Sequence, residues 1–175
     1  DRVQQNADTT PTQTAKPETA SEQTLLVDES RLSIYHGVDL TSDLSHLSDN
    51  QHKMLSLLID ASKIMDDLFW KQAFFEDKDA FLSSISDEKV RHFAAINYGP
   101  WDRLNGDTPF LSGYEDKALG AEFYPHDMEK EEFATADFGD KQGLYSMVKR
   151  DEAGNLYSVP YSEAFKSELM KASDL

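Results

Sequence analysis

Five residues of one short loop have side chains that are suited to binding a peptide or a sugar. Asn97, Tyr98, Trp101, Asp102 and Arg103 surround a Gly-Pro turn and combine two large aromatic rings, an amide, an acid and a base. Aromatic rings can pack against a ligand, while a carboxylate and a guanidinium can fix its orientation. Long loops are enriched in such functions. We therefore take these five residues as the candidate substrate-binding set.

The same loop also has a purely structural interpretation. Trp101 would fill a hydrophobic core, and Arg103 would pair with a carboxylate to hold the loop in place. The residue types alone are compatible with both interpretations.

No other stretch carries a catalytic or metal-binding motif. None of the five histidines is followed by Glu, so the helical zinc motif HExxH is absent. The chain has no cysteine, which excludes disulfides and thiolate ligands. Asp77 and Asp79 start like a calcium-binding loop, but Phe81 occupies a ligand position and cannot coordinate a cation. We assign no catalytic residue and no metal ligand in this chain.

The charge of the chain excludes other classes of partner. Its 175 residues contain 17 Lys and Arg against 33 Asp and Glu, a net charge of −16. Binding to a phosphate backbone requires clustered basic residues, and the sequence has no such cluster. It also has no run of the ~18 apolar residues that a membrane span requires. We expect an acidic protein of one domain plus a tail, without nucleic-acid partners or transmembrane segments.

Residues 1–24 form the predicted tail. They are rich in Thr and Gln, contain two prolines and show no hydrophobic period, which is typical of a flexible polar linker. Linkers of this composition join the lipid anchor of bacterial lipoproteins to their folded part, which favours a periplasmic or lipid-anchored location over the cytoplasm. An arbitrary starting point of the chain explains the tail equally well.

The elements that must position the candidate loop are mainly helical. Ser48 and Gln51 have the capping-box pattern at the start of a helix over 48–75. Its apolar residues recur every three or four positions, so we expect this helix to face the core. The residues of this stripe are Met54, Leu58, Ala61, Met65 and Leu68.

Shorter elements follow the long helix. Helices are predicted over 79–85, from Ser86 to Gly99, and after Pro125 with Asp127 as its cap. Residues 143–160 read as a β-hairpin with strands 144–148 and 156–159, and a last helix begins at Ser162. The predicted fold class is α+β, predominantly helical with a small hairpin. Because the last helix reaches Leu175 without a stop signal, we expect the chain to be the front part of a larger fold.

Three blocks of sequence resemble one known family. The blocks INYGPWDRLNGDTPFL, GAEFYPHDMEKEEF and LYSMVKRDEAGNLYSVPYSEAF are similar to the amino-terminal part of bacterial relatives of dipeptidyl-peptidase III, over residues 47–175. This is a family of zinc peptidases, some of them fused to Nudix domains. Family members are longer, and their zinc helix and catalytic Glu lie downstream of the part that matches this chain. No position here matches a zinc ligand or that Glu.

The resemblance implies a role for the chain within a longer enzyme. Residues 25–175 would be the amino-terminal helical region, incomplete at its C-terminus, of a zinc-dependent exopeptidase or related hydrolase. This region would be non-catalytic and inactive alone, and would contribute to the substrate cleft. Its partners would be the remainder of its own polypeptide and a peptide substrate, and the zinc would be held by the longer protein. The alternative is a cell-envelope binding or structural module without enzymatic activity.

Overall fold

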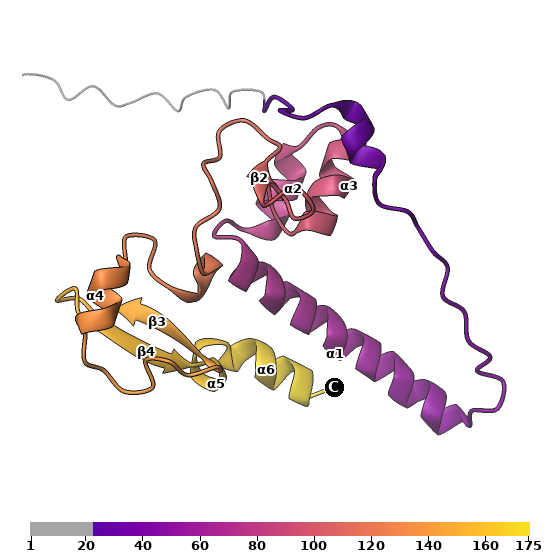
Figure 1. Ribbon diagram of the computed structural model, residues 1–175. Helices are drawn as coiled ribbons and strands as arrows, with labels where there is room; N and C mark the ends of the chain where they lie inside the picture. The colour runs from indigo at the N-terminus through magenta and orange to yellow at the C-terminus, as the bar shows by residue number, and fades with distance from the viewer. Residues whose placement is uncertain (1–22) are drawn as a thin grey trace, which may run out of the picture.

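The computed structural model describes residues 23–175, which form two groups of elements on one long helix (Figure 1). Most of the tail predicted over 1–24 lies outside these residues. The long helix is α1 (Asp49–Ala73). The first group contains a 3₁₀ turn (Glu29–Ser33), α2 (Lys78–Ser84), α3 (Glu88–Asn97), β1 (Trp101–Asp102) and β2 (Thr108–Pro109). The second contains a 3₁₀ turn (Ala121–Phe123), α4 (Lys130–Thr135), β3 (Ser146–Arg150), β4 (Leu156–Pro160), α5 (Tyr161–Ala164) and α6 (Lys166–Ser173). The predicted fold class, α+β with helices predominant, is confirmed.

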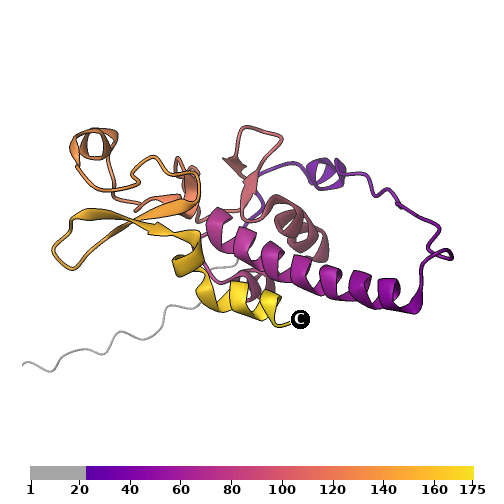
Figure 2. The same ribbon diagram turned by 90° about the horizontal axis from the view of Figure 1, so that it is seen from below.

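Helix α1 begins with the predicted capping box. The Ser48 backbone N–H donates to the Gln51 side chain at 2.8 Å, and the Gln51 N–H donates to the Ser48 hydroxyl. Only the C-terminal end of the helix is buried, at Leu68 and Trp70. The expectation that the whole stripe faces the core is therefore wrong, because no other described element covers the N-terminal part of α1. Figures 1 and 2 both show this part extending away from the rest.

The first group encloses the larger of two hydrophobic cores. We call it the aromatic core, because six of its ten buried residues are Phe or Trp. Phe93 and Phe110 have no exposed surface, and their rings pack edge to face with centroids 4.9 Å apart. Its buried members are Trp70, Phe74, Phe81, Ile85, Val90, Phe93, Ala94, Trp101, Phe110 and Leu111.

The start of the described chain is attached to this core. Leu25 forms an antiparallel bridge with Leu111, and the Leu26 N–H donates to the Phe110 carbonyl at 2.8 Å. The Ser112 N–H donates to the Thr24 carbonyl at 2.9 Å, so the pairing includes a residue of the predicted tail.

The second group surrounds a smaller core and a hairpin. We call Leu68, Met147 and Phe165 the hairpin core, since they join α1 to β3 and to the helices that follow β4. Strands β3 and β4 pair antiparallel around the predicted loop 151–155. The first strand was predicted two residues too early, because Leu144 and Tyr145 lie before it with exposed side chains.

Two predictions about helices in this group are also wrong. The single last helix is divided at Phe165, whose backbone (φ −118°, ψ 26°) leaves the helical region so that its ring can enter the hairpin core. Helix α4 has Glu129 at its N-cap position and no side-chain cap. The predicted cap, Asp127, instead pairs with Arg150. In both views α6 lies alongside α1 (Figures 1 and 2).

Candidate functional site

The candidate loop begins where the backbone of α3 reverses direction. Tyr98 caps the helix in the left-handed conformation (φ 55°), and Gly99 follows with φ 139°. A side chain at position 99 would place its Cβ 3.2 Å from the Trp101 ring. Glycine is therefore required there, both for its backbone freedom and for space. The reversal sends Trp101 into the aromatic core rather than toward solvent.

Trp101 is a core residue in this structure. It is 6% exposed, and its ring meets that of Phe74 edge to face at 5.6 Å. The indole N–H donates to the Glu115 carbonyl at 2.9 Å, so the polar atom of the ring is paired. The burial of Trp101 therefore supports a structural role for this residue.

Asn97 is buried and uses both ends of its amide. Its oxygen accepts hydrogen bonds from the Tyr35 hydroxyl at 3.0 Å and from the Arg103 backbone N–H at 3.1 Å. Its NH₂ group donates to the Phe93 carbonyl at 2.9 Å. Asn97 thus ties the N-terminal segment, α3 and the loop together, and these bonds occupy it within the fold.

Asp102 forms a buried ion pair with a residue that the sequence analysis did not identify. Its side chain is fully buried and accepts hydrogen bonds from Arg31 Nε at 2.6 Å and from the Leu104 N–H at 3.1 Å. The hydrogen bond to Asp102 raises the pKa of the Arg31 guanidinium. Arg103, which the structural interpretation expected to pair with a carboxylate, has none within ion-pair distance among residues 23–175. No local spacing could reveal Arg31, because 71 positions separate it from Asp102.

Tyr98 and Arg103 are the two members of the set that solvent reaches. The Tyr98 hydroxyl donates to Asp66 at 2.5 Å, and this hydrogen bond raises the pKa of the phenol. The Tyr98 ring packs edge to face on Phe69 at 4.6 Å. The Arg103 guanidinium lies 6.0 Å from the centre of the Tyr98 ring, within range of a cation–π contact. A substrate-binding role for the five residues stays a prediction, and these two are the ones placed to fulfil it.

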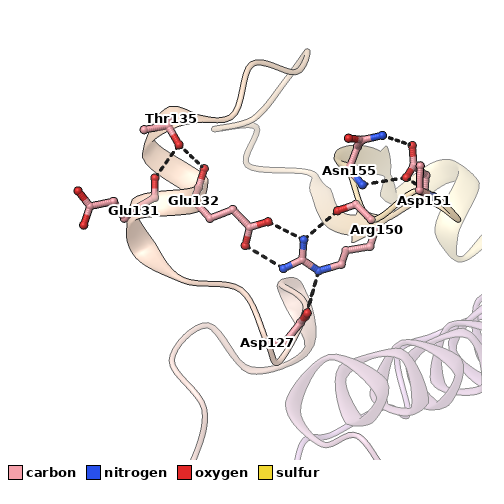
Figure 3. Close-up of polar contacts among 9 residues, drawn as sticks. Asp127, Glu131, Glu132, Thr135, Arg150, Asp151 and Asn155 are labelled. Carbon is pink, nitrogen blue, oxygen red and sulfur yellow. Dashed lines mark hydrogen bonds and ion pairs between the residues drawn. The ribbon is translucent and has the colours of Figure 1, made fainter.

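A second polar cluster joins the hairpin to α4 (Figure 3). Arg150 binds Glu132 through two parallel hydrogen bonds of 2.5 and 2.8 Å, and its Nε binds Asp127 at 3.0 Å. A further bond reaches the Gly154 carbonyl. The hydrogen bonds from Arg150 lower the pKa of both carboxyl groups, and together they raise the pKa of the guanidinium. The three side chains together carry a net charge of −1. Their ion pairs hold the hairpin against α4 and the segment before it.

A hollow of about 610 Å³ lies between the C-terminal end of α1 and the segment 113–126, and His126 is among its lining residues. His126 Nε2 is 3.0 Å from Glu122, and the imidazole meets the Phe75 ring edge to face. Two such groups are too few for a metal centre. In the part of the chain that the structure describes, no three His, Cys, Asp or Glu side chains are arranged to hold a metal ion. These residues therefore do not fit the zinc site that the family resemblance implies for the longer protein.

The sequence and the structure of this chain were compared with those of known proteins. No protein-family model matches the chain. A solved structure of dipeptidyl-peptidase III from Corallococcus sp. strain EGB superposes with a TM-score of 0.74 and 28% identity, over 83% of this chain and 29% of that one. The chain resembles dipeptidyl-peptidase III. The resemblance predicted from the three sequence blocks is confirmed.

A second relative is also named as a hydrolase, of a different kind. Nudix hydrolase 3 from Arabidopsis thaliana is 30% identical, over 83% of this chain and 27% of that protein. The chain therefore spans less than a third of the length of both proteins. Both comparisons indicate a hydrolase-related fold. Among the described residues, no helix has the length and apolar composition that a membrane crossing requires.

Proposed function

We propose that this chain is a non-catalytic region of a hydrolase related to dipeptidyl-peptidase III, and that it forms part of the wall of a peptide-binding cleft. One observation carries the proposal: 83% of the chain superposes on a peptidase while covering only 29% of it. In this proposal, the remainder of the polypeptide supplies the zinc ligands and the general base.

The chemistry of the described residues supports a non-catalytic role. Peptide hydrolysis requires a group that activates water and a group that polarises the carbonyl. Asp102 is occupied by Arg31, and Glu132 and Asp127 are occupied by Arg150. The acid–imidazole pair of Glu122 and His126 has no further metal ligand beside it among residues 23–175. These groups stabilise the fold instead of presenting a reactive centre.

The proposal is tested by zinc content and peptidase activity. The 175-residue chain and the longer polypeptide of its gene are purified, and each is assayed by elemental analysis and with dipeptidyl arylamides. We expect one zinc ion and activity in the longer polypeptide, and neither in the 175-residue chain. A gene that ends at residue 175, or a longer polypeptide without zinc and activity, contradicts the hydrolase function. Stoichiometric zinc in the short chain contradicts its non-catalytic role.

The cleft role is tested at Arg103, which is exposed and makes no ion pair with the rest of residues 23–175. In the longer polypeptide, Arg103→Ala should raise KM for peptide substrates by about tenfold, on the scale of one charged hydrogen bond. The melting temperature should not change. The matched control is Lys89→Ala, an exposed basic residue on α3. Equal KM values for the two variants contradict a contact between Arg103 and substrate.

The alternative function is a binding or structural module of the cell envelope. The exposed apolar residues of α1 favour it, because such surfaces mark interaction sites. A periplasmic or lipid-anchored location is part of either proposal and rests on the composition of residues 1–24. Fractionation of cells that produce the native gene product tests the location directly. Recovery in the cytosolic fraction contradicts it.

A further inference from the structure

We propose that an exposed apolar strip along α1 is the docking face for a helix from another segment of the same polypeptide. This inference rests on the proposed function, since it requires the longer hydrolase chain. The surface is a strip of five residues that recur at intervals of four, three, four and four. We call it the α1 strip; its members are Met54, Leu58, Ala61, Met65 and Phe69.

The side chains of the α1 strip are apolar, yet most of them are largely exposed to solvent. Met54 is 53% exposed and Leu58 is 57% exposed, while Met65 and Phe69 are 40% and 44% exposed. With 3.6 residues per turn, all five members lie within roughly a quarter of the helix circumference. They leave on the order of 500 Å² of contiguous apolar surface, which is at the upper end for a monomer and is usually functional.

Within the described chain, the Tyr98 ring packs on Phe69 at one end of the strip, and the exposed surface of the other members is left open. The aromatic core takes the side of the helix that carries Trp70, and α6 takes the side that carries Leu68. Ser56, Lys63 and Asp67 form an ordinary solvated face elsewhere on the helix. The α1 strip lies between the two covered sides and has the spacing at which ridges of one helix enter grooves of another. The small Ala61 in its middle leaves room for a large side chain of the partner.

The length of the relatives supports a segment of the same polypeptide as the occupant. The match covers 27% of one relative and 29% of the other, so more than two thirds of each lies outside it. A covalently attached helix covers the strip without the loss of translational freedom that a separate partner incurs. A second copy is disfavoured by charge, because each chain carries −16. The same charge disfavours an anionic lipid surface.

The absence of cysteine allows a direct test by thiol labelling. Leu58→Cys places one thiol on the strip. Lys63→Cys, on the solvated face where the Lys63 side chain is 71% exposed, is the matched control. Both variants are made in the 175-residue chain and in the longer polypeptide, whose remaining cysteines are replaced by serine. Labelling rates with a maleimide are compared under native conditions.

We expect both thiols of the 175-residue chain to react at similar rates. In the longer polypeptide, labelling of Leu58→Cys should be at least about 100-fold slower than that of Lys63→Cys, because it then requires local opening of a packed interface. Circular dichroism of each variant verifies that the fold is retained. As an independent readout, Met65→Cys should show the same protection.

The outcomes separate the docking face from the hydrolase function. Equal labelling in a folded, active longer polypeptide overturns the docking face and leaves the function intact. A protected Leu58→Cys in a longer polypeptide without peptidase activity supports the docking face and refutes the function. Protection already present in the 175-residue chain, with a dimer mass by light scattering, assigns the strip to a second copy and overturns the proposal.

Discussion

The two cores of this protein are stabilised in different ways. The aromatic core has ten buried residues, whereas the hairpin core has three. The charge pair of the first, Arg31 with Asp102, includes a carboxylate that is fully buried. The second is held by pairs at the surface, Arg150 with Glu132 and Lys71 with Glu168. The pair of the first core should therefore be less sensitive to salt concentration than the pairs of the second.

Physical magnitudes explain why burial dominates in the first core. Each fully buried large apolar side chain contributes about 1.5–3 kcal/mol, and the contribution does not depend on ionic strength. Exposed ion pairs contribute at most about 1 kcal/mol and are screened by salt. Substitutions in the aromatic core should consequently have larger effects than substitutions around the hairpin.

The largest effect is expected for Trp101→Ala. Removal of this buried indole leaves a cavity against Phe74 and leaves the Glu115 carbonyl without its donor, at a cost of about 4 kcal/mol. Chemical denaturation of the 175-residue chain measures the change. The control is Leu104→Ala in the same loop, where the side chain is 66% exposed and should cost less than about 0.5 kcal/mol. Equal losses for the two variants would show that the loop is not packed as described.

A smaller loss is expected for Asp102→Ala. The substitution removes a fully buried carboxylate that accepts hydrogen bonds from the Arg31 guanidinium and from the Leu104 N–H, and should cost about 3 kcal/mol. Asp116→Ala, at an exposed carboxylate, is the matched control and should have little effect. The cost at Asp102 should be nearly independent of salt concentration. A cost that disappears in 1 M salt contradicts a buried pair.

Acid should loosen the hairpin region before the aromatic core. The contacts of Glu168 with Lys71 and Ser167 lower its pKa to about 2, and Arg150 lowers the pKa of Asp127 and of Glu132. A carboxyl group with a lowered folded-state pKa stabilises the fold fully above its unfolded pKa. The contribution is lost as pH falls through the folded value. For Glu168 the loss therefore extends from about pH 4.5 down to about pH 2.

Different probes can follow the two regions through this titration. Both tryptophans of the chain, Trp70 and Trp101, belong to the aromatic core, so their fluorescence reports on that core alone. Amide-exchange protection of β3 and β4 reports on the hairpin. As pH falls from about 4.5 toward about 2, we expect protection of the hairpin to fall while the tryptophan emission is unchanged. Glu168→Gln should reduce the pH dependence, and coincident transitions of the two probes would refute independent responses.

Local signals in the sequence predicted most elements but not their surroundings. The capping box at Ser48, the helix end before Gly99 and the hairpin loop at 151–155 depend on neighbouring residues, and the structure contains all three. The pairing of Arg31 with Asp102 joins distant positions, so no spacing rule could reveal it. The hydrophobic period of α1 identified an apolar face correctly, but a period does not indicate which segment covers that face.

The smallest effect is expected for Leu58→Ala on the exposed part of α1. Leu58 is 57% exposed and alanine favours helix, so the 175-residue chain should change by less than about 0.5 kcal/mol. Leu68→Ala, ten residues later on the same helix, removes a side chain that is 7% exposed and should cost about 3 kcal/mol. In the longer polypeptide the two costs should become similar, because both leucines would then be packed. If Leu58→Ala remains neutral there, the α1 strip is a solvent-facing surface in the whole protein, and the contrast between the two ends of α1 belongs to the fold itself.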